Sequence, residues 1–285
     1  TTGSVTFISH SYSVAATGTQ TINNNSIVTG FNKGLAGGTI TLATSAGSST
    51  AGAVINHTNN NFSNITVTGA TTIAGWVSTD GGTANKTYSG NTFSNWTGGT
   101  SSVTAMSISN GGGSGIGNSI TNNTISTISG AGNITGISIG AAGTAHSVFQ
   151  NTISGLSSTS ATAAVTGIAA TGGALTANIY RNKIYNLSSS GATPVISGVL
   201  VSGSTANNVN NIYNNLIGDL TASAASNGTT AVIRGINITS TAATSSINVL
   251  DNTIRLSGAG GTDFTSTCVF HTASATATTA TLNLR

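Results

Sequence analysis

The side chains that could perform acid–base chemistry are few in this 285-residue sequence, and their spacing does not bring them together. Aspartates are the only acids, and there are four of them. Glycoside hydrolysis requires two carboxylates about 5 to 10 Å apart, yet Asp219 and Asp251 lie in neighbouring sequence repeats at different offsets. The other two, Asp80 and Asp263, are expected in distant loops. We therefore expect no catalytic residues and a protein that is not an enzyme.

Metal and nucleophile chemistry are weakly indicated as well. His10, His57, His146 and His271 come from different repeats without the short ligand spacing of a zinc site, so we expect them at the surface or in loops. Cys268 is the only cysteine, which excludes an internal disulfide framework and a cysteine-ligated zinc. The glycine-rich run from residue 111 lacks the Lys-Ser/Thr ending of a phosphate-binding loop. A Ser-His-Asp triad stays open because serine is abundant, but we expect no metal and no cofactor.

Aromatic side chains point to binding more than to catalysis. Trp76 and Trp96 fall where other repeats carry aliphatic residues, so we expect them in the core. A column of large apolar residues, two positions before a recurring asparagine, is expected to face outward. Such a stripe could bind a glycan or a protein, or it could shield the sheet beneath it, and the sequence leaves both alternatives open. The stripe comprises Phe149, Tyr180, Tyr213 and Leu250.

Charge is sparse and does not favour a nucleic acid or a membrane. Only 4% of the residues are charged, the net charge is +3, and the bases form no patch, so we expect no nucleic-acid partner. No run of about eighteen apolar residues exists, so we expect no membrane insertion. Most cations of the C-terminal half are expected to be solvated, and a weakly basic edge facing an acidic glycan or lipopolysaccharide is the alternative. These cations are Arg181, Lys183, Arg234 and Arg255.

A recurring Asn-x-apolar motif reveals the element that must position these side chains. The motif returns every 28 to 37 residues, and in the middle copies a second apolar residue follows three positions later. Variable spacing around a fixed short motif is typical of a solenoid with loops of unequal length. The predicted structural asparagines are Asn60, Asn91, Asn123, Asn151, Asn182, Asn215 and Asn252, with a related copy at Asn25.

Two further apolar stretches accompany each motif, so the repeat predicts three short strands. One stretch has a small residue in its middle, as in Ile134-Thr-Gly136-Ile137, and the other ends three residues before the asparagine. In a three-sided coil each strand pairs with its equivalent one turn away, so that branched aliphatics stack inside. We expect the asparagines to form a hydrogen-bonded ladder at an inward corner, with a left-handed backbone, and the small residues to mark a second corner.

The sequence thus predicts an all-β fold, a right-handed, three-sided parallel β-helix of about eight coils. We expect one domain over 1–285, with an N-terminal strand or edge coil at 1–20 and the repeats at 21–285. The pattern resembles the right-handed parallel β-helix superfamily of pectate-lyase-like solenoids. It is closest in style to the Ser/Thr/Gly/Asn-rich repeats of surface proteins from type 9-secreting bacteria. That resemblance implies an extracellular or cell-surface location.

The expected function is a secreted or cell-surface structural and adhesive solenoid. Neither end shows a capping helix, so we expect either further domains of a longer chain or self-association through uncapped ends into an extracellular filament. The sequence begins without Met and without a leader, so any export signal is removed or lies outside it. A carbohydrate-binding or polysaccharide-degrading β-helix is the alternative, with a glycan as partner, and an ice-binding solenoid is the third.

Overall fold

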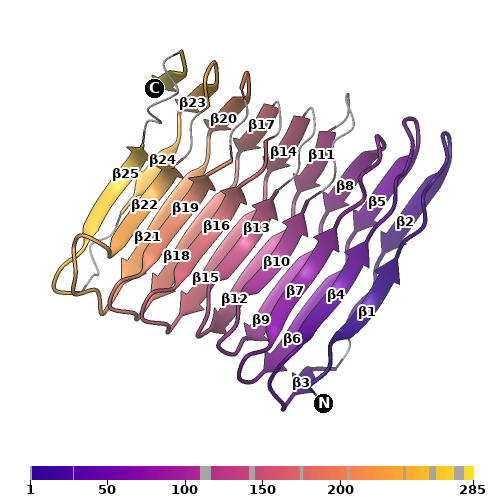
Figure 1. Ribbon diagram of the computed structural model, residues 1–285, viewed down its shortest axis with the longest axis horizontal. Helices are drawn as coiled ribbons and strands as arrows, with labels where there is room; N and C mark the ends of the chain where they lie inside the picture. Colours follow the sequence, from indigo (N-terminus) through magenta and orange to yellow (C-terminus); the bar gives the residue numbers. More distant parts are fainter. Residues whose placement is uncertain are drawn as a thin grey trace.

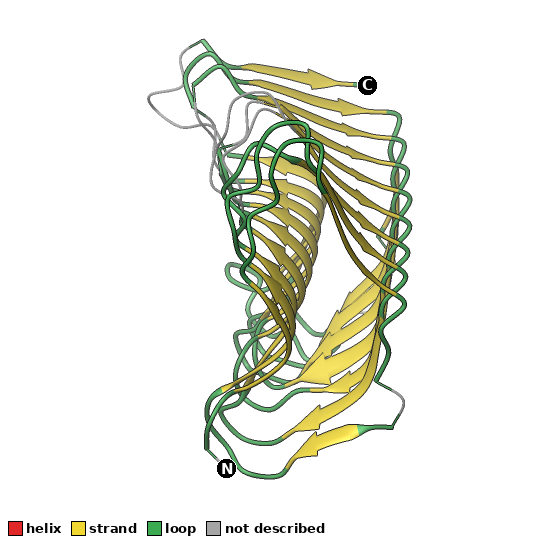
Figure 2. Ribbon diagram, turned by 90° about the vertical axis from the view of Figure 1, so that its right-hand side faces the viewer, coloured by secondary structure: helices red, strands yellow, loops and turns green. Residues whose placement is uncertain are grey.

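The computed structural model describes residues 2–27, 29–109, 117–140, 145–173, 176–203, 206–239, 242–256, 261–272 and 279–285. The described residues contain strands and loops and no helix, and hence no helix that could cross a membrane. The chain winds through three parallel sheets in turn, so that each coil adds one strand to each sheet (Figures 1 and 2). Eight full turns are followed by β25 and β26, which confirms the predicted three-sided parallel β-helix of about eight coils. The glycine-rich run from residue 111 lies mostly outside the described residues.

Every strand pairs in parallel with the equivalent strand of the neighbouring coil. Sheet A contains β1 (Val5–His10), β4 (Thr39–Ser45), β7 (Thr72–Ser78), β10 (Val103–Ile108), β13 (Ile134–Ile139), β16 (Ala164–Ala170), β19 (Val195–Val201), β22 (Val232–Ile238) and β25 (Thr265–His271). Sheet B contains β2 (Thr19–Asn23), β5 (Val54–Thr58), β8 (Asn85–Ser89), β11 (Gly117–Thr121), β14 (Ala145–Phe149), β17 (Thr176–Tyr180), β20 (Val209–Tyr213), β23 (Ser246–Leu250) and β26 (Thr281–Leu284). Sheet C contains β3 (Phe31–Lys33), β6 (Asn61–Val67), β9 (Thr92–Thr97), β12 (Thr124–Gly130), β15 (Thr152–Ser158), β18 (Lys183–Ser189), β21 (Leu216–Ala222) and β24 (Thr253–Arg255).

The core consists of columns of like side chains that run through successive coils. Ile125, Ile153 and Ile184 occupy matching positions of β12, β15 and β18, and all three are buried. Matching positions meet because parallel strands pair in register, so the sequence repeat becomes a column in space. Trp76 and Trp96 are also buried, as predicted, and the indole Nε1 of Trp96 donates a hydrogen bond to the Phe62 carbonyl.

A left-handed residue explains why the two apolar residues of each motif are three positions apart. In a regular strand, Ile153 and Leu156 would point to opposite faces of the sheet. Both are fully buried, however, because Gly155 between them has a φ of 65° and bends the strand. The same position on other coils is left-handed in Asn64, Asn95, Thr127, Asn186 and Asp219.

The small residues lie in the middle of sheet A strands, so their predicted place at a corner is wrong. A Cβ on Gly136 would lie 2.6 Å from the carbonyl oxygen of Gly167 and 3.0 Å from Cγ2 of Ile153. The constraint is therefore the close approach of sheet A to the next coil and to the isoleucines of sheet C. Cys268, in the last strand of sheet A, is exposed.

Candidate functional site

The recurring asparagines form one hydrogen-bonded ladder along the solenoid. On a typical rung, Nδ2 of Asn151 donates to Oδ1 of Asn182 (2.9 Å) and to the Ile120 carbonyl (3.0 Å), while the backbone N–H of Asn151 donates to the same Oδ1 (3.1 Å). The rungs are Asn25, Asn60, Asn91, Asn123, Asn151, Asn182, Asn215 and Asn252. Because the inner rungs are buried and bonded on both sides, they hold coils together and offer little to a ligand.

The left-handed backbone expected at these asparagines is found one residue earlier. Asn122, Gln150, Arg181 and Asn214 directly precede a rung and have φ values of 54° to 56°. This left-handed residue turns the chain from sheet B into sheet C, so that the following asparagine points inward. Asparagine tolerates the conformation better than other L residues, which makes Gln150 and Arg181 unusual occupants of this column.

The predicted aromatic stripe is a stack of parallel rings on sheet B. The ring centroids of Phe149 and Tyr180 are 4.9 Å apart with 4° between the planes, and those of Tyr180 and Tyr213 are 4.8 Å apart with 2°. Leu250 is paired with Tyr213 on the next coil. Each inner ring face is therefore covered by a neighbouring ring, and the exposed part is the ring edge. A sugar that needs an open ring face finds none in the middle of this stack.

A second row of asparagines, absent from the sequence predictions, lies beside this stack. Nδ2 of Asn211 donates to Oδ1 of Asn178 (2.8 Å), Nδ2 of Asn248 donates to Oδ1 of Asn211 (2.7 Å), and Asn283 continues the row to Asn248. These amides are half-buried or exposed on the outer face of sheet B. The repeated triplets Asn178-Ile-Tyr180 and Asn211-Ile-Tyr213 were the signal that could have revealed the row.

Two histidines are buried, which corrects their predicted place at the surface or in loops. His57 lies in β5 in register with Tyr88, and its fully buried ring packs on Tyr88 and Trp76 at centroid distances of 5.1 and 4.5 Å. Among the residues that the structure describes, neither ring nitrogen of His57 has a hydrogen-bond partner. Burial, together with the charges of His10 and Lys86, lowers its pKa to about 3, although Asp80 acts in the opposite direction. His146, in β14, is also buried, and its Nδ1 contacts Nδ2 of Asn118 at 3.1 Å.

Asp80 closes a loop instead of facing a substrate. Its carboxylate accepts hydrogen bonds from Oγ of Ser49 (2.9 Å) and from the backbone N–H groups of Ser49 and Gly82, and it lies 3.6 Å from Nζ of Lys86. Burial alone would raise the pKa of Asp80, but these hydrogen bonds and the charge of Lys86 outweigh it and lower the pKa. Both side chains are almost fully buried, so this ion pair is structural.

The remaining acids lie apart from Asp80. Asp251 is exposed and pairs with Arg285 at 3.7 Å, and Asp219 occupies the left-handed position of β21. Within the described ranges, no three His, Cys, Asp or Glu side chains are grouped as a metal site requires.

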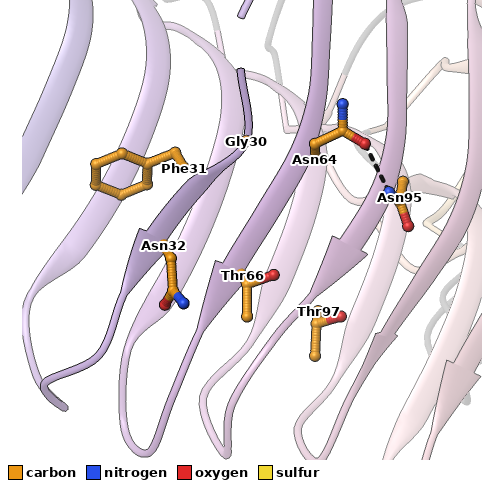
Figure 3. A pocket seen from close by; sticks show the side chains of 7 residues that line it. All are labelled: Gly30, Phe31, Asn32, Asn64, Thr66, Asn95 and Thr97. Carbon is orange, nitrogen blue, oxygen red and sulfur yellow. Dashed lines mark hydrogen bonds between the residues drawn. The ribbon is translucent and has the colours of Figure 1, made fainter.

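Two shallow hollows open on the outer face of sheet C. The first, of about 270 Å³, is neutral and lies over β3, β6 and β9; there Asn32, Thr66 and Thr97 lie side by side, and Nδ2 of Asn95 donates to Oδ1 of Asn64 at 2.6 Å (Figure 3). The second, of about 330 Å³, is cationic, being lined by Gln150, Asn151, Thr152, Arg181 and Lys183.

No protein-family model, curated protein or solved structure matches this chain. Its coil geometry is therefore the basis on which a function can be proposed.

Proposed function

We propose that this chain is a structural and adhesive β-solenoid of a secreted or cell-surface protein, and that it is not an enzyme. The observation that carries the proposal is the unbroken asparagine ladder from Asn25 to Asn252, which links every coil to the next through side-chain hydrogen bonds. Such a ladder adds directional cross-links to the backbone pairing of a parallel stack. The result is a stiff rod of about 40 Å for eight coils about 4.8 Å apart.

The use of polar side chains supports the same conclusion. Asp80 and Lys86 are joined to each other inside a loop, and Nζ of Lys33 donates to the carbonyls of Leu35 and Gly37. In a hydrolase such charged side chains would point into a substrate groove, whereas here they stabilise turns. We also propose that the chain is related to the pectate-lyase-like superfamily and to the surface repeats of type 9-secreting bacteria. An extracellular location is part of the same proposal.

Extension of the rod into a filament is a further part of the proposal. The edge strands β1 and β25 bear apolar residues, among them Ile8 and Val269, that pack against the core and are only partly buried. The edge of a parallel sheet accepts another strand of the same register. A further coil, supplied by the same polypeptide or by a second copy, would continue the sheets and the ladder.

Carbohydrate binding is the second candidate, and the cationic hollow at Arg181 and Lys183 favours it. An ice-binding surface ranks third. Thr104, Thr135 and Thr166 form a column on sheet A. Ala74 and Arg234 occupy the same column, so the threonine row is interrupted.

One experiment distinguishes a structural solenoid from a polysaccharide-degrading enzyme. Purified chain is imaged by electron microscopy and incubated with acidic and neutral polysaccharides, and the release of new reducing or unsaturated ends is measured. We expect rods or filaments and no products. Steady product release that scales with protein concentration would overturn the proposal.

A further inference from the structure

An exposed tyrosine on sheet C differs from the stacked tyrosines of sheet B. Tyr185, in β18, is 39% exposed, and no aromatic ring of the described residues packs on it. Its neighbour on the preceding coil is Ser154, and its neighbour on the following coil is Gly218. Because Gly218 has no side chain, the position in register with Tyr185 on the following coil places no side chain over it. Tyr180, by contrast, has a ring on either side.

Three cations lie on the same face of sheet C as Tyr185 or at its adjacent corner. Lys183 precedes Tyr185 by two residues and therefore faces the same side of the strand, and Arg255 lies above Gly218 in the same column. Arg181 lies at the corner before Lys183, and the two line the cationic hollow with Gln150 and Thr152. All three cations are exposed, and within the described part of the chain none has a carboxylate at ion-pair distance.

The backbone of Arg181 is a second indication that this corner has a role. Arg181 has a φ of 55° in a column that holds Asn24, Asn59, Asn122 and Asn214 on other coils. L residues other than asparagine, aspartate and histidine seldom adopt this conformation, and strained backbone is concentrated at binding sites. An asparagine would fit this backbone conformation better, so the arginine carries a cost in backbone strain, as Gln150 does on the preceding coil.

We infer that Tyr185, Lys183, Arg181 and Arg255 form a binding site for an acidic saccharide, with the open ring face of Tyr185 as the platform and the cations as partners of a carboxylate, sulfate or phosphate. A ring face packs against the C–H groups of a sugar, while guanidinium and ammonium groups bind oxyanions through charge-assisted hydrogen bonds. The hydroxyl of Thr152 and the amide of Gln150 supply neutral contacts in the same hollow. The inference rests on the second candidate of the proposed function, carbohydrate binding, and names its ligand class and its residues.

The test measures binding of the intact chain to four probes by calorimetry at low and moderate salt. The probes are an alginate oligosaccharide, a heparin-derived oligosaccharide, a neutral cello-oligosaccharide and a single-stranded oligothymidylate. We expect binding to at least one acidic saccharide, weakening with added salt because exposed charges are screened. The alginate and heparin arms distinguish a carboxylate from a sulfate as the preferred group.

Two kinds of variant address the platform and the charges. Tyr185→Ala removes the ring, and Gly218→Tyr covers it as Tyr213 covers Tyr180. Each should weaken binding about tenfold, the loss expected for one stacking contact. A Cβ at Gly218 meets only ordinary contacts, the nearest at 3.6 Å, so Gly218→Tyr should remain folded. Arg181→Asn and Lys183→Thr place the residue types of other coils at these positions and should reduce both affinity and its salt dependence.

Tyr12→Ala, at an exposed tyrosine of the N-terminal coil, is the matched control and should bind normally. Folding of each variant is checked by circular dichroism. Equal binding by Gly218→Tyr and the parent chain, equal binding of the neutral probe, preference for the oligothymidylate, or no binding by a folded parent chain would each overturn the site. None of these binding results concerns catalysis, so a negative result would refute the binding site and leave the structural function unaffected. Release of polysaccharide products, by contrast, would refute the proposed non-enzymatic function.

Discussion

Acid should destabilise the N-terminal coils through His57. The ring is fully buried against Trp76 and Tyr88, and its pKa falls from 6.5 to about 3. At pH 7 the imidazole is neutral in both the folded and the unfolded chain, so stability is unaffected. Below pH 6.5 the His57 imidazole binds a proton in the unfolded chain but stays neutral in the folded chain. The free energy of unfolding therefore decreases as the pH falls from 6.5 to about 3.

The size of this loss follows from the two pKa values. The difference between 6.5 and about 3, at 1.36 kcal/mol for each pKa unit, amounts to about 5 kcal/mol over the whole range. Between pH 6.5 and pH 4.5 the expected loss is about 2.7 kcal/mol. Asp80 has a lowered pKa and therefore loses its contribution only at more acidic pH, so it does not obscure this window.

The assay is urea unfolding at pH 7.5, 6.0, 5.0 and 4.5 for the parent chain and for His57→Leu. Leucine fits because the same column holds Ile22 and Ile120, so the variant should be stable and nearly independent of pH over this range. His271→Asn, at the far end of the solenoid, should keep the parent's slope. The reasoning would be refuted if the unfolding free energy of the parent chain did not change with pH, or if that of His57→Leu fell with pH as steeply as that of the parent.

Further substitutions test the two asparagine rows, the glycines of sheet A and the strained corner. Asn151→Ala removes three side-chain donor contacts and also the Oδ1 that accepts hydrogen bonds from the backbone N–H and Nδ2 of Asn123. Because these groups are buried, the substitution should cost about 2 to 4 kcal/mol of unfolding free energy, whereas Asn178→Ala on the outer row should cost less than about 1 kcal/mol, both measured by denaturant unfolding. Gly167→Ala places a Cβ 2.6 Å from the Gly198 carbonyl oxygen and should lower the melting temperature markedly, while Gly140→Ala, whose nearest contact is 3.6 Å, should not. Arg181→Asn should raise stability by about 0.5 to 1 kcal/mol by relieving the left-handed arginine; unchanged stability would show that the corner is unstrained.

The fold and the ladder were within reach of the sequence, whereas the binding surfaces were only partly so. The outward column of Phe149, Tyr180, Tyr213 and Leu250 could be located from alternation, but the orientation of the rings could not. That orientation decides whether a ring face or a ring edge meets the solvent. The sequence pattern does not single out Tyr185, because what distinguishes it is the absence of a side chain at Gly218, thirty-three residues later.

The differences between the predicted and the observed placements have separate causes. The sequence predicts His57 at the surface or in a loop because the histidines lack metal-ligand spacing. It is buried because it occupies the position three before Asn60, which is apolar in other coils. Lys33 and Lys86 are buried because the carbonyl groups of their own loops satisfy them, and loop conformation leaves no periodic trace in the sequence. The left-handed turn was assigned to the ladder asparagine, although the preceding residue adopts it.

The sequence alone determined that the chain coils, how many coils there are and which residues form the inward columns. It could do so because in-register parallel pairing converts a repeat along the chain into contact between successive turns. Only the tertiary structure decided which rings cover one another, which ionisable groups are buried and which cations lie without an acid. These properties depend on distances between different columns and on loops of unequal length, where the repeat no longer dictates the neighbour.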